Sequence, residues 1–397
     1  MAIERLLRMD PVRQSSLGIR FTPAEIAQQP RVWPAAAAAV SAVAGELRSL
    51  LEGSEEVVLT GAGSSYFVGR SAEAALAPRL AGRRVRAVPS TEIVMDPLGT
   101  LPARPFTLVS IARSGNSPEG NAAFRLAEEL RGDAVRHIVL TCSGDGELAR
   151  LGRSTSHPSA VVLMPAAAND QGLAMTSSFT SLLVAALGLG FLDRPGEYVE
   201  VVERLAQAFP VLCRAADDLM ASLAERKVER AFFIGSGSFF GAALESHLKV
   251  QELTAGEVVG KAEETLGLRH GPLAGINPAT LVVLFGSSSP YRRRYEADLA
   301  RELAAKELGL ARIVVCGRAD PAWHESAHHV LEFDPEGRLN LDDDLVAPLL
   351  VLPAQLYGLY RSLALGLEPD TPSRAKVITR VVQGVTIYPF IPGDRRN

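Results

Sequence analysis

The sequence ARSGNSPE, at residues 112–119, decides the fold. It follows an apolar run at 106–111 and precedes an apolar-periodic segment at 122–130, so the order strand, loop, helix is predicted. Ser117 is placed to cap this helix and Pro118 to begin it. Free N–H groups and the positive end of the helix dipole also favour an anion there. The stretch is typical of an ordinary cap or of an anion-binding loop, and the rest of the chain favours the loop.

The strand–loop–helix pattern is duplicated along the chain. GAGSSYF pairs with GSGSFFG, RSGNSPE with GSSSPYR, and IVLTCS with IVVCGR, and a long apolar helix closes each half, at 178–192 and 345–365. The predicted strands are 56–60, 85–89, 106–111, 137–142, 160–164, 231–234, 280–285, 312–315 and 329–333. Alternating strands and helices predict an α/β fold with two tandem doubly wound domains, each a mainly parallel sheet flanked by helices.

The same pattern divides the chain into five parts. We expect an N-terminal helical arm at 1–45, α/β domains at 46–195 and 229–367, a connecting helix at 196–228 and a C-terminal strap at 368–397.

Local signals add detail within these parts. In the arm, Thr22 is expected to cap a helix that Pro23 begins, with Glu25 at the capping-box position. Pro210 is expected to break or restart the connecting helix. The strap carries a short β-like run at 385–388.

Charge and cysteine content exclude several classes of protein. The formal net charge is -4 without a long run of one sign, which argues against nucleic acid or an anionic membrane as a partner. Cys142, Cys213 and Cys316 are distant and odd in number, so neither a disulfide framework nor a cysteine metal site is expected, and no HExxH occurs. There is no secretory signal and no apolar run long enough to span a bilayer, so we expect a soluble cytoplasmic protein.

The pair GAGSS and ARSGNSPE, one strand apart, resembles the sugar isomerase (SIS) domain. The tandem arrangement resembles the isomerase half of glucosamine-6-phosphate synthase, and more closely the bacterial AgaS-like proteins, called tagatose-6-phosphate ketose/aldose isomerases or galactosamine/glucosamine-6-phosphate deaminases. The resemblance extends over nearly the whole chain, through FTPAEIAQQPRVW, TEIV, NDQGLAMTSSFTS, LRHGP and RVVQGVTIYP. It implies that both α/β domains are SIS domains.

The resemblance also implies a phosphate site in the first SIS domain. By position, Ser64 and Ser65 match one pair of phosphate-binding hydroxyls, and Ser114 and Ser117 match the second pair. Arg113 stands where the synthase type has glutamine, so a cation is gained at the anion site. The second half lacks the full set of hydroxyls, and its loops are expected to be structural.

A trio of charged residues lies on the predicted helix 239–253. Spacings of four and three residues place Glu245, Lys249 and Glu252 on one face, which by itself is typical of a solvated salt-bridge face. By resemblance, LKVQELTAG holds the catalytic carboxylate. Glu252 is then the base that moves a proton between carbons 1 and 2 of the sugar, and Lys249 orients this base or stabilises negative charge on the sugar oxygen.

His270 lies in LRHGP, where Gly271 and Pro272 fix a turn. The histidine either bonds to the backbone of the turn or shuttles the proton that opens the sugar ring. The resemblance favours the catalytic role and implies that the histidine comes from the partner subunit. The expected enzyme is therefore a homodimer with a shared active site.

Four further residues are weaker candidates for sugar contacts. Asn169, Thr176 and Ser177 precede the buried helix of the first half, where they contact the sugar or serve as loop and cap residues. Lys376 lies in the tail, near the place where the synthase type has an active-site lysine, and a solvated tail lysine is the alternative.

These residues together predict a phosphosugar isomerase/deaminase that converts a galactosamine- or glucosamine-type hexosamine 6-phosphate into a ketose 6-phosphate and ammonia. Neither a cofactor nor a metal is expected. A plain ketose/aldose 6-phosphate isomerase and a non-catalytic sugar-phosphate-binding regulatory protein are the alternatives. Ala2 stands where glutamine-dependent synthases have a cysteine, and no glutaminase domain precedes the tandem halves, so glutamine-dependent synthesis is not expected.

Overall fold

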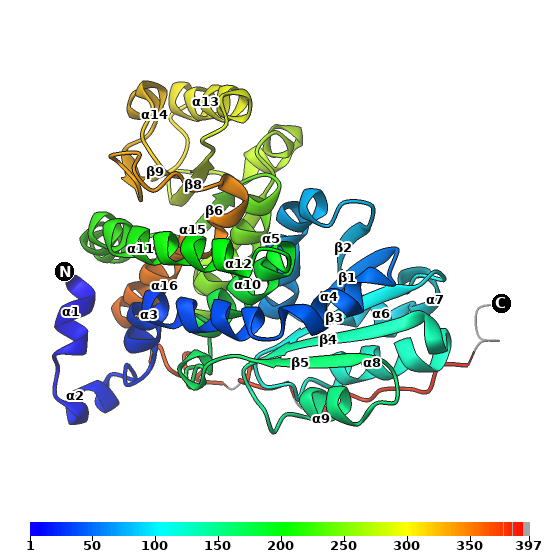
Figure 1. Cartoon of the computed structure of the whole chain (residues 1–397). Coiled ribbons are helices and arrows are strands. Elements are labelled where there is room, and N and C mark those ends of the chain that lie inside the picture. Colours follow the sequence, from blue (N-terminus) through cyan, green and yellow to red (C-terminus); the bar gives the residue numbers. More distant parts are fainter. Residues whose placement is uncertain (376, 383, 392–397) are drawn as a thin grey trace.

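The computed structural model of the chain describes residues 1–375, 377–382 and 384–391. Within these residues it contains two five-stranded parallel sheets, one in each half of the chain, with helices around and between them (Figure 1). The first sheet has the order β2-β1-β3-β4-β5 and the second β10-β9-β8-β6-β7. The two orders are the same when each half is numbered from its own first strand. The expected α/β fold with a duplicated parallel sheet is confirmed.

The strands lie close to the predicted apolar runs. Their bounds are β1 Glu56–Gly61, β2 Arg84–Pro89, β3 Phe106–Ala112, β4 Val135–Thr141, β5 Ser159–Leu163, β6 Arg230–Ile234, β7 Val259–Glu263, β8 Thr280–Gly286, β9 Ala311–Cys316 and β10 His329–Glu332. The interior strands of each sheet are buried along nearly their whole length and are mainly apolar, because helices cover both faces of a parallel sheet. The pattern of apolar runs does not predict β7, VGKAE, because this edge strand has no buried residue and therefore no apolar run.

The helices fill the connections between the strands. Their bounds are α1 Ala2–Leu7, α2 Pro11–Ser16, α3 Thr22–Ser41, α4 Ala44–Glu52, α5 Ser64–Arg79, α6 Ser90–Met95, α7 Pro97–Thr100, α8 Pro118–Arg131, α9 Glu147–Ser154, α10 Ser177–Gly188, α11 Pro195–Ala224, α12 Ser238–Leu253, α13 Pro290–Ala305, α14 Pro321–Ser326, α15 Ala347–Leu350 and α16 Leu352–Ala364. Within the part of the chain that the structure describes, none of them has the length and apolarity needed to cross a membrane.

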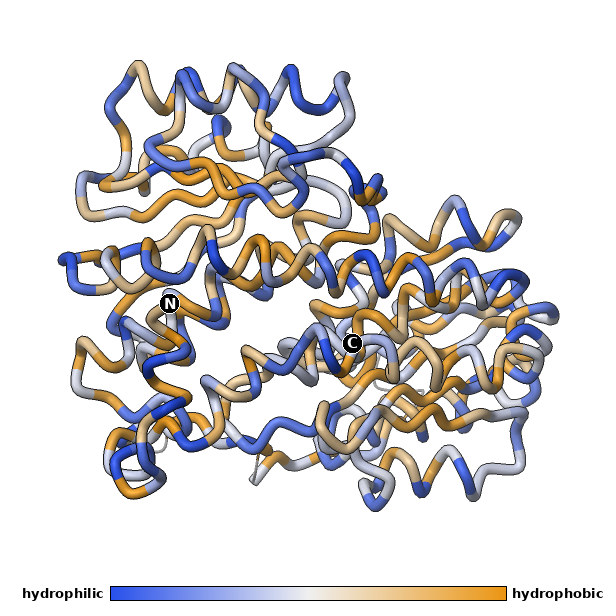
Figure 2. Tube along the Cα trace, turned by 60° about the vertical axis from the view of Figure 1, so that its left-hand side comes forward, coloured by the Kyte–Doolittle hydropathy of each residue, from blue (hydrophilic) through white to orange (hydrophobic). Residues whose placement is uncertain are grey.

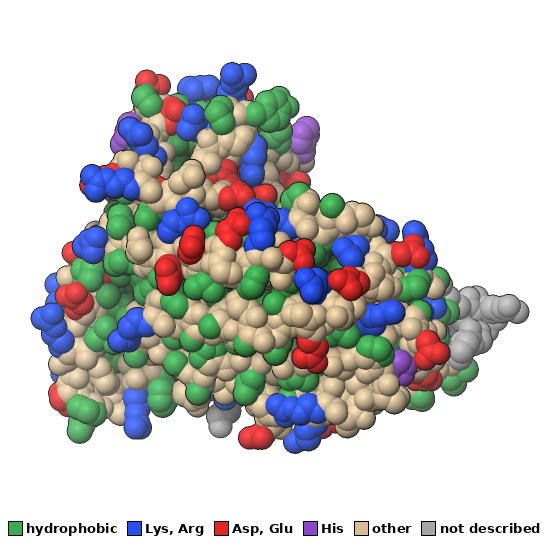
Figure 3. All heavy atoms as spheres, viewed as in Figure 1, with side chains coloured by type: hydrophobic (Ala, Val, Ile, Leu, Met, Phe, Trp, Pro, Cys, Tyr) green, Lys and Arg blue, Asp and Glu red, His purple; other side chains and the backbone are tan. Residues whose placement is uncertain are grey.

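The core continues from one half into the other. Every residue of α10 is buried, as its mainly apolar composition predicts, and α10 packs against α3 and α5. The hydropathy colouring shows apolar segments in the strands and hydrophilic ones on the outer turns (Figure 2). On the face of the molecule that Figure 3 shows, acidic and basic side chains are interspersed. The three cysteines are free and buried, as small core residues are.

Three local predictions are wrong. Pro210 does not break the connecting helix: α11 runs through it, because the residues around it, including Phe209 and Leu212, are held in the core. Residues 385–388 form no strand, since no neighbouring edge pairs with them. The capping box is absent: Thr22 begins α3 rather than preceding it, and its hydroxyl donates to Asp370 at 2.7 Å.

Two helices join the halves at close range. Helix α5 of the first half and α12 of the second pack against each other in the middle of the molecule (Figure 1). The helices can approach because α12 has Gly241 at the crossing. A Cβ atom there would lie 2.3 Å from the backbone nitrogen of Ser71 on α5. This crossing sets the position of the charged face of α12 relative to the loops of the first half.

We expect Gly241→Ala to lower the free energy of unfolding by about 1–3 kcal/mol, because the helices must separate to admit the methyl group. Urea denaturation measures this change. Gly45→Ala is the matched control, since Gly45 also lies in a helix but a Cβ atom there would have no neighbour within 4 Å. Alanine there should leave the protein equally stable or more stable. Equal effects of the two substitutions would contradict the close-crossing account.

Candidate active site

A cavity of about 570 Å³ lies at the carboxyl ends of β1 and β3. This is the edge of a parallel sheet at which open α/β proteins bind ligands. Its walls come from the loops after the two strands, from the C-terminal part of α12 and from residues 377–382 of the tail, here called the wall segment. The cavity therefore combines elements from both halves and from the C-terminus.

Two helices begin at the loops that line the cavity. Helix α5 follows Gly63, whose positive φ of 55° suits glycine, and α8 follows Ser117. Neither helix receives a side-chain cap from the residues that the structure describes. Their first N–H groups and dipoles therefore favour an anion at this end of the cavity.

The four predicted phosphate serines all line this cavity. Ser64 and Ser65 lie in the first turn of α5, and Ser114 and Ser117 in the loop after β3. The Ser114 hydroxyl accepts from the backbone N–H of Asn116 at 3.3 Å. The Ser117 hydroxyl donates to the carboxylate of Glu119, on α8, at 2.8 Å. Ser117 therefore precedes the helix without capping it through its side chain.

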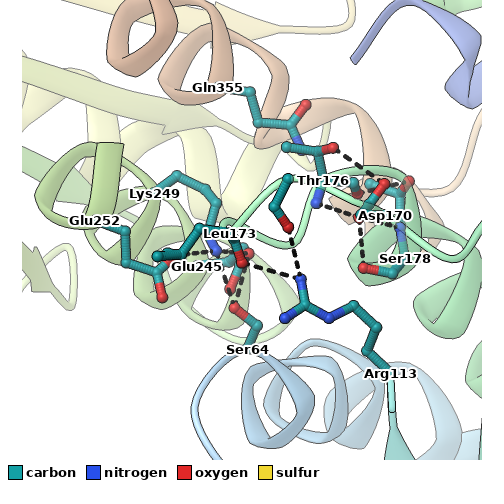
Figure 4. A network of polar contacts seen from close by, with 12 residues as sticks. Ser64, Arg113, Asp170, Leu173, Thr176, Ser178, Glu245, Lys249, Glu252 and Gln355 are labelled. Atoms are coloured by element: carbon teal, nitrogen blue, oxygen red, sulfur yellow. Dashed lines mark hydrogen bonds and ion pairs between the residues drawn. The ribbon is translucent and has the colours of Figure 1, made fainter. Parts of the chain in front are cut away.

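A polar network joins the two halves behind the cavity (Figure 4). Lys249 Nζ donates to Glu252 Oε2 at 2.5 Å and to Ser64 Oγ at 3.1 Å, and it lies 3.2 Å from Glu245 Oε1. Ser64 in turn donates to Glu245 Oε1 at 3.1 Å. The side chains of Glu245 and Lys249 are fully buried, whereas that of Glu252 is 22% exposed and lines the cavity. The charged face of α12 thus points into the protein, with one carboxylate reaching the cavity.

Burial and charge set the protonation of this network. Burial raises the pKa of Glu245 to about 8, although Lys249 acts in the opposite direction. Burial lowers the pKa of Lys249, but the carboxylates of Glu245 and Glu252 outweigh it and raise that pKa. Lys249 is therefore a fixed cation next to the carboxylate in the cavity.

The raised pKa of Glu245 predicts a pH dependence of stability. The folded state keeps the proton of Glu245 at pH values where the unfolded chain has lost it. The contribution of Glu245 to the free energy of unfolding is therefore complete below about pH 4.5 and is lost as the pH rises to about 8. We expect Glu245→Gln to flatten the fall of the unfolding free energy over this range, measured by urea denaturation at several pH values. Glu264 is exposed, so Glu264→Gln should leave the pH dependence of the unfolding free energy as it is in the wild-type protein. If the two variants showed the same pH dependence, Glu245 would not be the group that causes the fall.

Arg113 also borders the cavity, but its guanidinium is occupied by backbone groups. It donates to the carbonyl oxygens of Leu173 at 2.9 Å, Gly172 at 3.3 Å and Arg380 at 2.8 Å. The contact with Leu173 is visible in Figure 4.

The remaining predicted residues that the structure describes lie outside this cavity. Thr176 is buried and its N–H donates to Asp170 at 2.7 Å, and Asn169 accepts from Arg380 at 3.1 Å. The hydroxyl of Ser177 is buried. His270 is exposed in the 3-10 turn η4 (Gly267–His270) and does not line the cavity of its own chain. Lys376 falls outside the residues that the structure describes.

Four polar residues of the cavity wall were not predicted from the sequence. Each has a buried side-chain oxygen for which the described residues offer no hydrogen-bond partner: Thr60, Ser90, Ser110 and Asn121. Two of them, Thr60 and Ser110, lie near the carboxyl ends of β1 and β3 within mainly apolar runs, which is a signal that the sequence did contain.

Comparisons with known proteins agree with this architecture. The SIS domain model matches residues 50–189 and 223–363. The chain is 44% identical to the AgaS protein of Streptomyces coelicolor over 388 residues, or 95% of this chain and 97% of that one. It is 36% identical to the D-galactosamine-6-phosphate deaminase AgaS of Escherichia coli O157:H7 over 381 residues, or 93% and 96%.

A solved structure extends the likeness to three dimensions. The tagatose-6-phosphate ketose/aldose isomerase of Escherichia coli matches with a TM-score of 0.82 and 32% identity, over 93% of this chain and 96% of that one. Both halves match a SIS domain, and the relatives are matched along nearly their whole length. The chain therefore belongs to the SIS domain family.

Proposed function

We propose that this protein converts a hexosamine 6-phosphate, galactosamine 6-phosphate first among the candidates, into a ketose 6-phosphate with release of ammonia. The observation that carries the proposal is one cavity with uncapped helix N-termini at one end and, at its wall, Glu252, which the buried Lys249 contacts from behind. The first feature suits a phosphate and the second suits proton transfer. The similarity to AgaS proteins supports the amino sugar as substrate.

In the proposed reaction the phosphate lies against Ser65, Ser114 and Ser117 and the two helix N-termini, with Arg113 adding positive charge. After ring opening, the carbon 1 aldehyde makes the carbon 2 proton acidic. Glu252 removes this proton and returns it to carbon 1, while the Lys249 cation stabilises the negative charge that develops on the sugar oxygen. The carbon 2 imine that forms is hydrolysed by water to the ketone and ammonia.

The alternatives differ in what each leaves in solution. Ammonia together with a ketose phosphate from galactosamine or glucosamine 6-phosphate supports the deaminase and identifies the sugar configuration. Interconversion of hexose 6-phosphates without ammonia supports the plain isomerase. Absence of turnover with all of these compounds supports the regulatory protein. We also propose that the protein is cytoplasmic, because the three free thiols of the chain are typical of proteins in a reducing compartment.

We further propose that two chains share the active site. His270 lies outside the cavity of its own chain and is exposed, and exposed apolar side chains, Val259 and Leu266, lie in the same β7–η4 stretch. An exposed histidine beside exposed apolar groups suits a self-complementary interface. In a dimer, His270 of the partner subunit would serve as the ring-opening acid and base.

A mixing experiment tests the shared site. Glu252→Gln and His270→Ala should each be inactive, and after unfolding and refolding together about a quarter of the wild-type activity should return, since half of the dimers then hold one intact site. Native mass spectrometry of the refolded mixture, with an affinity tag on one of the two variants, is the control for subunit exchange because it counts the mixed dimers directly. If the mixture stays inactive although subunits exchange, each site is built from one chain.

A further inference from the structure

The wall segment, residues 377–382, closes one side of the cavity although it is poorly packed. Val377 is 83% exposed and Val382 is 53% exposed. Three residues of the segment, Ile378, Thr379 and Arg380, also border a second cavity of about 580 Å³. A segment between two cavities buries little apolar surface, so packing contributes little to holding it in place.

Two arginines hold this segment by hydrogen bonds to the same loop, residues 169–173. Arg113 donates from Nη1 to two carbonyl oxygens of the loop, at 2.9 and 3.3 Å, and from Nη2 to the carbonyl oxygen of Arg380 at 2.8 Å. Arg380 donates from Nη2 to the loop, to Asn169 Oδ1 at 3.1 Å and to the carbonyl oxygen of Asp170. Each arginine therefore connects the wall segment to the loop, one from the end of β3 and one from the segment itself.

The arrangement depends on the shape of the guanidinium group. Its planar fork of N–H donors can bridge carbonyl oxygens from two segments at once, whereas a lysine ammonium acts as a single flexible point. Arg113 is buried, and the fully buried carboxylate of Asp170 is a nearby negative charge that offsets the two cations. Asp170 is itself fixed by the backbone N–H groups of Thr176 and Ser178.

We propose that Arg113 and Arg380 form a reciprocal latch that places the wall segment over the cavity. In this role Arg113 is a positioning residue: it acts on the substrate through the wall segment, and its hydrogen bonds to backbone take precedence over direct phosphate binding. The kinetic part of this inference rests on the proposed function, whereas its structural part does not.

The structural test uses limited trypsin digestion of the full-length protein, followed by mass spectrometry, with Arg113→Lys, Arg380→Lys and the double variant. Lysine keeps the charge and the trypsin site but loses the fork. We expect cleavage after residue 380 to be about tenfold faster in each single variant, since a charged hydrogen bond that closes the segment is lost. Arg312→Lys is the matched control, because Arg312 also bridges two backbone carbonyls, at 3.1 Å each, but lies in the second half.

The kinetic test uses the same variants. A latch predicts that KM for the hexosamine 6-phosphate rises about tenfold in each single variant, with kcat changed far less, and that the double variant is no worse than either. Additive losses, or cleavage of Arg113→Lys at the rate of Arg312→Lys, would overturn the latch and return Arg113 to direct phosphate binding. If the protein turns over no hexosamine phosphate, the proposed function fails, but the digestion rates still decide the latch. If Arg113→Lys does not fold, Arg380→Lys alone tests the latch, because Arg380 is exposed and its substitution should not disturb the core.

Discussion

Glu252→Gln should lower kcat for the hexosamine 6-phosphate by a factor of about 10²–10⁴, the usual contribution of a general base. In the wild-type protein, Lys249 Nζ donates to Glu252 Oε2 at 2.5 Å. The glutamine amide keeps the shape of the side chain and an oxygen that can accept this hydrogen bond, but it cannot take the carbon 2 proton. Binding of inorganic phosphate should be unchanged, since the phosphate end of the cavity is formed by other loops. Steady-state kinetics and equilibrium dialysis measure the two effects.

Glu257→Gln is the control for this substitution. Glu257 is an exposed glutamate that follows the same helix, so its loss changes the net charge equally without touching the cavity. If Glu252→Gln retained activity within a factor of about ten of Glu257→Gln, another group would have to be the base, because a general base contributes more than this. Loss of phosphate binding in Glu252→Gln would point instead to a distorted cavity.

Lys249→Met should lower the free energy of unfolding by about 3–5 kcal/mol, the cost of breaking a buried ion pair. Methionine has a similar length, but it leaves the carboxylates of Glu245 and Glu252 facing each other without their shared cation. Activity should fall as well, because the base loses its orienting partner. Urea denaturation at pH 9, above the pKa of about 8 at which Glu245 becomes a carboxylate, measures the loss of stability, and steady-state kinetics measure the loss of activity.

Lys261→Met is the matched control for Lys249. Lys261 pairs with Glu263 at 3.0 Å, but its side chain is about half exposed, and such surface pairs contribute about 0–1 kcal/mol. The double variant Lys249→Met/Glu245→Gln should recover part of the lost stability, since it removes the repulsion between the carboxylates. Equal stability of the Lys249 and Lys261 variants would contradict the assignment of a buried charge network.

The parts of the fold that were predictable are those buried on both sides. The interior strands β1, β3 and β8 were placed within about one residue, because continuous apolar runs with loop signals define a buried parallel strand. Edge strand β7 and the absence of a strand at 385–388 depend on pairing between distant segments, which a local pattern does not contain. The continuation of α11 through Pro210 could not be predicted for the same reason, since tertiary packing outweighs the tendency of this proline to break a helix.

In the candidate site, too, some features could be predicted from the sequence, whereas others depend on contacts between distant segments. Helical spacing alone predicted a solvated charged face on α12, but the resemblance to the SIS family meant that the four serines and Glu252, which line the cavity, could be predicted. The burial of Lys249 between two carboxylates could not, since it depends on the crossing of α5 and α12 around Gly241. The hydrogen bonds of Arg113 to backbone carbonyls also depend on a tail more than 250 residues away in the sequence. The location of His270 relative to a partner subunit stays a prediction.

The most direct test of the proposed function follows one incubation of the wild-type protein with galactosamine 6-phosphate by NMR, alongside Glu252→Gln. The account predicts equal amounts of ammonium and ketose 6-phosphate that appear together, at a rate proportional to the wild-type protein and near background with the variant. An unchanged amino sugar in both samples, or equal ammonium release by wild type and Glu252→Gln, would contradict it.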